Sequence, residues 1–145
     1  MTFASYDPKD VHIIVDGNPI TGFADGTFAV VSFDEQQWNK KVGADGHVAR
    51  AKSNNYSGTV TVTLLATGLG NDVLNQLWQR DRRTNDGAKS LLIKDMQGRT
   101  VWSAKQAWVQ QMPDQGYGKE IEDREWVLDC ANLLGQAGGN VQESF

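Results

Sequence analysis

Between residues 57 and 66, side chains that carry a hydroxyl group alternate with apolar ones. Alternation with a period of two predicts a β-strand with one face on a hydrophobic core and the other face open. One face carries hydroxyl groups, and the stretch contains no residue types typical of an active site, which favours a surface for pairing and assembly. The hydroxyl face carries Thr59, Thr61 and Thr63, and the core face carries Val60, Val62 and Leu64.

One helix is expected directly after this strand, over residues 72–82. Asn71 or Asp72 suits the N-cap position, because a short polar side chain there can accept a hydrogen bond from a free backbone N–H. Leu74, Leu77 and Trp78 then recur with helical spacing. The predicted core is drawn from this helix and from the strands around it: Val60, Val62, Leu64, Leu77, Trp78, Trp126 and Leu128.

Short runs of branched and aromatic residues, separated by Gly, Asn, Asp and Pro turn signals, predict strands along the rest of the chain. This pattern indicates a mainly β fold, an antiparallel sandwich or barrel with one flanking helix. One domain over 1–135 is expected, followed by a polar, glycine-rich and flexible tail over 136–145. The expected strands cover 11–15 with a partner at 20–23, then 27–33, a short strand at 48–51, 90–95, 99–104 and 120–131, with 107–112 extending the hairpin or starting a new strand.

The last expected strand, over 120–131, has an acidic face made of Asp123, Glu125 and Asp129. Two carboxylates can form the acid and base of a glycosidase. The opposite face holds Trp126 and Leu128, which is typical of a half-buried strand with one wet side. We therefore interpret these carboxylates as surface groups and not as a catalytic pair.

Several classes of function find no support in the composition. The chain has a single cysteine, Cys130, and only two histidines, His12 and His47, so neither a base-activated nucleophile nor a metal or cofactor site is expected. The net charge of −4 and the pI near 5.0 argue against a dedicated nucleic-acid binder. With neither a signal sequence nor a membrane anchor expected, the protein is predicted to be made in a cytoplasm.

Residues 34–55 form a long polar segment with weak patterning. A loop of this length in a small domain is typically functional or disordered. It combines one aromatic residue with charges, as the rim of a protein interface does. The candidate contacts between subunits or rings are Trp38, Lys40, Lys41, Asp45 and Arg50.

Taken together, an ordered set of short motifs resembles the tail tube protein family of contractile-tailed bacteriophages. The resemblance extends over roughly residues 6–135, and no single motif within it is diagnostic. The segments that carry it are Asp10-Val11, Asp16-Gly17, Gly22 to Thr27, Val42 to Gly46, Ala49-Arg50, Ser57 to Leu65, Asn71-Asp72, Ile93 to Asp95, Pro113-Asp114, Gly118 to Glu120, Arg124 to Trp126 and Cys130-Ala131.

This resemblance implies a structural subunit and not an enzyme. Tail tube subunits share a β-sandwich or barrel with a flanking helix and a long assembly loop, as do the tubes of type VI secretion systems. The implied assembly is a stack of hexameric rings inside a contractile sheath, which delivers the genome. The implied partners are further copies of the chain, the sheath, the baseplate initiator and the tail terminator, with DNA passing through unbound. The implied location is the virion tail, after synthesis in the bacterial cytoplasm.

Within such a tube, the strands at 57–66 and 120–131 are expected to pair with strands of neighbouring subunits. Their polar faces would then line the channel, through Thr59, Thr61, Thr63, Asp123, Glu125 and Asp129. Two alternatives remain open. One is a monomeric β-sandwich that binds carbohydrate or protein through exposed tryptophans, Trp38, Trp102 or Trp108. The other is an enzyme with an unrecognised acidic site.

Overall fold

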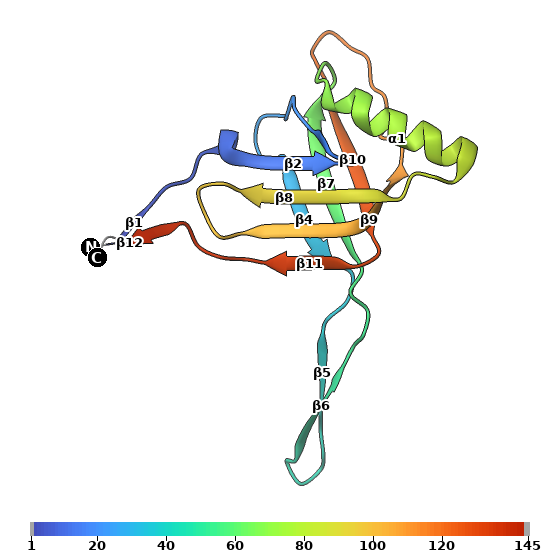
Figure 1. Ribbon diagram of the computed structural model, residues 1–145. Coiled ribbons are helices and arrows are strands. Elements are labelled where there is room, and N and C mark those ends of the chain that lie inside the picture. Colours follow the sequence, from blue (N-terminus) through green and yellow to red (C-terminus); the bar gives the residue numbers. More distant parts are fainter. Residues whose placement is uncertain (1, 144–145) are drawn as a thin grey trace.

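The computed structural model describes residues 2–143, which form a mainly antiparallel β protein with one α-helix (Figure 1). The predicted fold class is therefore confirmed. In chain order the elements are β1 (Thr2–Ala4), the short 3-10 helix η1 (Pro8–Asp10), β2 (Val11–Val15), β3 (Asn18–Pro19), β4 (Ala29–Phe33), β5 (Trp38–Val42), β6 (Val48–Lys52), β7 (Gly58–Leu65), α1 (Gly70–Thr84), β8 (Lys89–Asp95), β9 (Val101–Gln111), β10 (Asp123–Cys130), β11 (Leu133–Gln136) and β12 (Val141–Glu143).

The main sheet has eight strands and folds over on itself at β9. Its order is β3-β2-β8-β9-β10-β7-β4, with β11 beside the first half of β9. Residues 101–104 of β9 pair with β8 and β11, whereas residues 107–111 pair with β10. The two parts of the sheet therefore run in different directions: in Figure 1, β2, β8 and β11 run across the view, whereas β7 and β10 run steeply through it. The long strand β9 thus joins two crossed layers.

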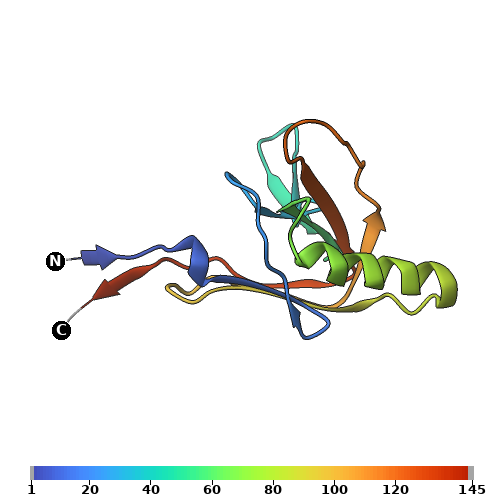
Figure 2. The same ribbon diagram turned by 90° about the horizontal axis from the view of Figure 1, so that it is seen from above.

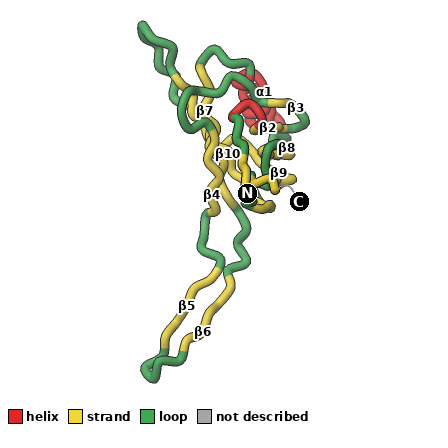
Figure 3. The backbone as a smooth tube through the Cα atoms, turned by 90° about the vertical axis from the view of Figure 1, so that its left-hand side faces the viewer, coloured by secondary structure: helices red, strands yellow, loops and turns green. Residues whose placement is uncertain are grey.

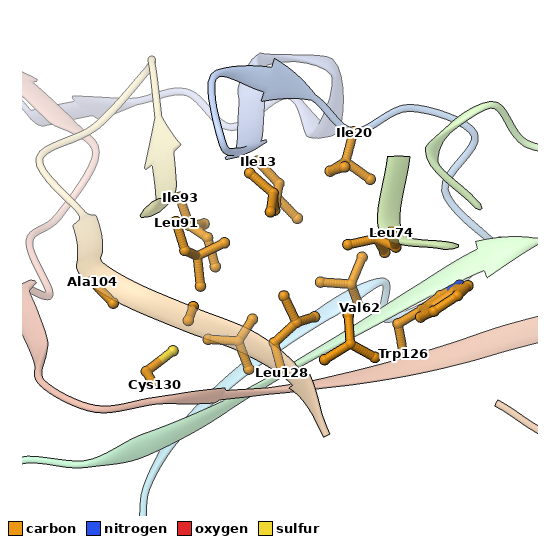
Figure 4. Close-up of a cluster of buried hydrophobic side chains, with 14 of the residues drawn as sticks. Ile13, Ile20, Val62, Leu74, Leu91, Ile93, Ala104, Trp126, Leu128 and Cys130 are labelled. Atoms are coloured by element: carbon orange, nitrogen blue, oxygen red, sulfur yellow. The ribbon is translucent and has the colours of Figure 1, made fainter. Parts of the chain in front are cut away.

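The hydrophobic core lies between these two layers and α1 (Figure 4). Six of the seven residues predicted for the core are buried: Val60, Val62, Leu64, Leu77, Trp126 and Leu128. Trp78 is the exception, because its ring is only partly buried at the margin of the core. The guanidinium carbon of Arg82 lies 4.6 Å from the centre of that ring, so the indole is covered by a cation on its outer side.

Helix α1 is longer than expected and begins without a side-chain cap. The N-cap residue is Leu69, and the prediction that Asn71 or Asp72 caps the helix is wrong. Asn71 lies within the first turn, where its Nδ2 donates to the carbonyl oxygens of Leu65 at 2.7 Å and Gly68 at 3.0 Å. The side chain therefore ties the helix start to the end of β7. Asn85 ends the helix with a left-handed φ of 57°.

Several strand boundaries differ from the predicted ones. The partner of β2 is β3 at residues 18–19, and not 20–23. Residues 107–111 continue β9, as one of the two expected arrangements allowed. The last long strand begins at Asp123 instead of residue 120, so that residues 112–122 form a loop between β9 and β10.

Two segments contain more strand than predicted, and in the first of them only the short strand at 48–51 was expected. Residues 34–55 include the hairpin β5–β6, which projects away from both layers (Figures 1 and 3). In the segment expected to be a tail, β12 pairs with β1, and the two chain ends run out side by side from the body (Figure 2). We call the paired strands β1 and β12 the arm. Asn140 anchors the arm, because its Nδ2 donates to the carbonyl of Ser5 and to Oδ2 of Asp95, both at 2.8 Å. Residues 144–145 of that segment lie outside the described part of the chain.

Candidate assembly surfaces

The six residues expected to line a channel lie together on one face of the sheet. In the register of β7 and β10, Glu125 is opposite Thr63 and Asp129 is opposite Thr59. Residues opposite each other in adjacent strands share a face. Burial alternates along both strands, with Val60, Val62, Leu64, Trp126 and Leu128 inward and the six candidate channel residues outward. We refer to the outward side of β4, β7 and β10 as the polar face; it includes Thr59, Thr61, Thr63, Asp123, Glu125 and Asp129.

The polar face is acidic. In β4, β7 and β10, the outward side chains include three carboxylates and no lysine or arginine. Asp34 adds a fourth carboxylate at the end of β4, where its oxygens accept hydrogen bonds from Ser57 Oγ at 2.8 Å and Thr59 Oγ1 at 3.1 Å. Asp129 accepts a longer bond from Gln110 Nε2 at 3.4 Å. The face therefore repels anions.

One of the two strands predicted to pair with neighbouring subunits is closed off within the chain. β7 lies between β10 and β4, so the prediction that 57–66 pairs laterally is wrong. β10 pairs with β7 along its whole length but with β9 only through residues 127–130, so the prediction for 120–131 is wrong for that half of the strand. The free borders of this layer are β4 on one side and, on the other, residues 108–111 of β9 with residues 123–126 of β10.

β4 presents an open row of backbone groups. Two bonds flanking the strand, Thr63 N–H to Phe28 C=O and Asp34 N–H to Ser57 C=O, fix which residues face β7. Because hydrogen-bonded and non-bonded pairs alternate in an antiparallel ladder, Val30 and Ser32 bond to β7. The N–H and C=O groups of residues 29, 31 and 33 therefore point outward, which is the arrangement that accepts a further strand.

The hairpin β5–β6 is exposed along its whole length. An isolated two-stranded hairpin is at best marginally stable in water. Its register divides the side chains into two unequal faces. The face we call the basic face carries three apolar and three cationic residues, Trp38, Lys40, Val42, Val48, Arg50 and Lys52, whereas the other face carries Asn39, Lys41, Ala49 and Ala51.

The predicted contact residues of this segment are thus only partly brought together. Trp38, Lys40 and Arg50 share the basic face, with the Arg50 guanidinium carbon 3.8 Å from the centre of the Trp38 ring. Lys41 points to the opposite face. Asp45 lies in the turn at the hairpin tip, where its Oδ1 accepts a hydrogen bond from the His47 N–H at 3.1 Å.

The start of α1, the loop 112–122 and the start of β10 lie at the end of the molecule opposite the hairpin tip (Figure 1). Their side chains enclose a cavity of about 640 Å³. Its walls combine carboxylates with aromatic rings, and we call it the acidic pocket. The wall residues used below are Asp72, Trp78, Glu120, Glu122, Arg124 and Trp126.

Arg124 is a buried cation in the wall of this pocket. Its side chain is 6% exposed, and it forms no ion pair with a carboxylate within residues 2–143. Nε donates to Gln115 Oε1 at 2.8 Å, whereas the buried Nη1 has no hydrogen-bond partner among the described residues. In the alternation along β10, Arg124 falls on the same side as Trp126 and Leu128, so its inward position can be predicted from the sequence.

The side chains considered for catalysis are dispersed. His12 lies in β2 opposite Lys94, whereas His47 lies at the hairpin tip. Within residues 2–143, no group of three or more His, Cys, Asp or Glu side chains is placed to hold a metal ion. Burial, and then the carboxylates of Asp129 and Asp34, raise the pKa of the Cys130 thiol to about 11, so the thiol is protonated at neutral pH.

The tryptophans do not form a single binding platform. Trp38 is on the projecting hairpin, while Trp102 packs against the core and edge-on to Phe33, with ring centres 5.8 Å apart. Trp108 is opposite Asp129 in the pairing of β9 with β10, so it lies at the polar face. A carbohydrate-binding module would need these rings on one exposed surface, and this arrangement argues against that alternative.

Comparison with known proteins agrees with this picture. The family model described as Bacteriophage PhiTE tail tube protein matches residues 17–138. "Structural protein ORF10" of Pseudomonas phage KPP10 is 30% identical over 149 aligned residues, which cover 97% of this chain and 86% of that protein. Because tail tube proteins are structural subunits, the expectation that the chain is not an enzyme is confirmed.

Solved structures show the same fold in contractile injection systems. The tube-terminating cap of the anti-feeding prophage has a TM-score of 0.62 at 12% identity, covering 92% of each chain. A chain of the PVC sheath–tube complex in the extended state has a TM-score of 0.61 at 13% identity, again covering 92% of each. The PVC sheath/tube terminator scores 0.62 at 16% identity, covering 93% of this chain and 99% of that one.

None of the helices described between residues 2 and 143 is both long and apolar enough to span a membrane.

The match to the family model extends over most of the chain, from β3 to the segment before β12. The protein is a member of the phage PhiTE tail tube protein family, a structural component of a phage tail.

Proposed function

We propose that six copies of the chain form a ring, that the rings stack into the inner tube of a contractile tail, and that the genome passes through this tube into the host. The observation that carries the proposal is the open border of β4, whose outward backbone groups have no partner strand within residues 2–143. A neighbouring copy would supply that strand. The expected location is accordingly the virion tail, after synthesis in the host cytoplasm.

The order of the strands supports closure into a ring. Each strand in the series β4, β7, β10 and β9 is antiparallel to the next. With four strands of alternating direction, β4 of one copy can join residues 108–111 of β9 in the next copy and remain antiparallel. A heterologous contact of this kind forms a ring when its rotation closes. Strand addition at a sheet edge is also an established mode of protein recognition.

The polar face is then the wall of the channel. DNA carries about one negative charge per 1.7 Å of helix axis, and proteins hold it by neutralising phosphates. The polar face of β4, β7 and β10 instead carries three carboxylates, Asp123, Glu125 and Asp129, which makes eighteen in a ring of six. An acidic wall repels phosphates and so favours rapid passage. The three threonines beside them are uncharged and hydrophilic.

The remaining partners follow from the same assembly. Two of the similar structures come from PVC complexes described as a sheath–tube complex and a sheath/tube terminator. By analogy, we expect this chain to contact a sheath protein on the outside of the tube, an initiator in the baseplate and a terminator at the far end.

A pair of proline substitutions at adjacent positions tests the proposal. Proline removes a backbone N–H and is tolerated at a sheet edge only where that N–H is not bonded within the chain. Val31→Pro removes an outward N–H, so we expect a folded subunit that forms no rings in electron micrographs. Val30→Pro removes an N–H that bonds to β7, so we expect loss of folding itself. Rings of normal abundance from Val31→Pro would contradict the proposal.

A further inference from the structure

The hairpin and the acidic pocket lie at opposite ends of the subunit, in line with the strands that connect them. β7 begins at the end nearest the hairpin and finishes beside the start of α1 (Figures 1 and 3). The first turn of α1 forms part of the pocket wall. In a stack of identically oriented rings, the hairpin end of one subunit therefore faces the pocket end of a subunit in the next ring.

The two ends carry opposite charge. Between Trp38 and Lys52 the hairpin has four cationic side chains and one carboxylate, a net charge of +3. The pocket is lined by three carboxylates, Asp72, Glu120 and Glu122, and by the single cation Arg124. Complementary charge of this kind orients two surfaces and speeds their encounter.

In the described part of the isolated chain, the hairpin exposes apolar side chains and the pocket contains a buried nitrogen without a hydrogen-bond acceptor. The basic face exposes 43% of Trp38, 57% of Val42 and 59% of Val48, although the hairpin packs against neither layer of the body. In the pocket, the buried Nη1 of Arg124 lacks an acceptor among the described residues. A buried guanidinium that has no carboxylate partner and one unsatisfied nitrogen is costly, so an occupant that supplies an anionic oxygen is favoured.

We propose that the hairpin tip of one copy enters the acidic pocket of a copy in the adjacent ring. In this arrangement the basic face lies against the carboxylates of the pocket, and its apolar residues cover Trp78 and the loop 112–122. Asp45 is the one carboxylate between residues 38 and 52 and lies at the tip, so it is the group that faces Arg124. The inference rests on the proposed stacking of rings and names the receptor for the hairpin.

Lys40 and Lys41 provide a matched test, because they are adjacent in sequence and point to opposite faces of the hairpin. Lys40→Glu is expected to leave rings intact but to raise the protein concentration needed for tube formation by about tenfold. Lys41→Glu makes the same change in charge on the other face and is expected to have little effect. Sedimentation separates rings from tubes, and electron microscopy counts them.

Two further variants test the receptor. Glu120→Lys with Glu122→Lys is expected to impair stacking alone and to restore it when combined with Lys40→Glu. Asp45→Asn keeps an acceptor for the His47 N–H but removes the charge, and is expected to weaken stacking about tenfold. If rings form and Lys40→Glu and Lys41→Glu behave alike, or the combined variant shows no rescue, the inference is wrong while the proposed function stands. A wild-type chain that forms no rings would contradict both.

Discussion

The indole Nε1 of Trp126 donates a hydrogen bond to Asn71 Oδ1 across 2.8 Å, although the two residues are far apart in the chain. Trp126 lies in β10, and Asn71 lies in the first turn of α1. Because Asn71 Nδ2 also bonds to Leu65 and Gly68, one amide joins the end of β7, the middle of β10 and the start of the helix. This junction forms one side of the acidic pocket.

Asn71→Leu should therefore destabilise the subunit. The substitution keeps the approximate volume but leaves the Trp126 N–H without its acceptor. The Leu65 carbonyl keeps its bond from the Gly68 N–H. Leaving a buried polar group unsatisfied costs about 1–3 kcal/mol, and we expect a loss of about that size in the free energy of unfolding, measured with urea. Asn75→Leu, at a second polar position of the pocket wall, is the control and should cost less than Asn71→Leu.

Adjacent residues of β7 test the assignment of its two faces. Val62 is 1% exposed, so Val62→Asp places a charge in the core and should cost about 3–5 kcal/mol, enough to unfold a marginally stable subunit. Thr61 lies on the polar face, and Thr61→Asp should leave the subunit folded. Circular dichroism and thermal unfolding measure both. Similar damage from the two substitutions would show that the faces are wrongly assigned.

The Cys130 thiol should make stability depend on alkaline pH. Its pKa rises from 9.0 to about 11 in the folded chain, chiefly through burial. The unfolded chain loses the proton first, so the contribution of the thiol is fully present below pH 9 and is lost as the pH rises through 11. The loss of stability over this interval should be smaller in Cys130→Ala. Equal slopes for the two proteins would contradict the raised pKa.

At neutral pH the same thiol should be unreactive. Thiol reagents attack the thiolate, and both burial and the raised pKa suppress it. We expect a chromogenic disulfide reagent at pH 8 to label Cys130 slowly in the folded subunit and rapidly in urea. Fast labelling of the folded protein would show that the part of the core around Cys130 opens readily.

Reversing the charge of the polar face should make the tube retain DNA. Glu125→Lys with Asp129→Lys is expected to leave assembly intact, because both side chains point away from the core. DNA should then bind to assembled tubes with an affinity that falls steeply as salt rises, and ejection from reconstituted particles should slow. Asp86→Lys, in the turn between α1 and β8, alters the charge away from this face and should have neither effect.

The sequence was sufficient for features that depend on local periodicity. Alternation along β7 and β10 correctly placed Thr61 and Glu125 outward and Val62 inward, because side chains of a strand alternate regardless of its partners. The general position of α1 followed from the spacing of Leu74 and Leu77. These patterns, together with the motif order, were enough to indicate the family.

Features that depend on distant partners were not predictable in the same way. Which strands lie at the border of a sheet is decided by pairing between remote segments, so β7 was wrongly expected to be free when β4 is the open strand. Asn71 has the residue type of a cap, but its bond to Trp126 arises only when the two layers meet. The sequence predicts a short strand at 48–51 but not its partner β5, because both faces of the hairpin are exposed and its pattern is therefore weak.

Amide hydrogen exchange across β4 is the measurement that tests the central proposal most directly. In the isolated subunit, the amides of Val30 and Ser32 should exchange slowly because they bond to β7, whereas those of Ala29, Val31 and Phe33 should exchange rapidly. Assembly into rings should slow the second set until all five amides are protected. If the amides of residues 29, 31 and 33 remain in rapid exchange in assembled rings or tubes, neighbouring subunits are not joined through β4 and the account is wrong.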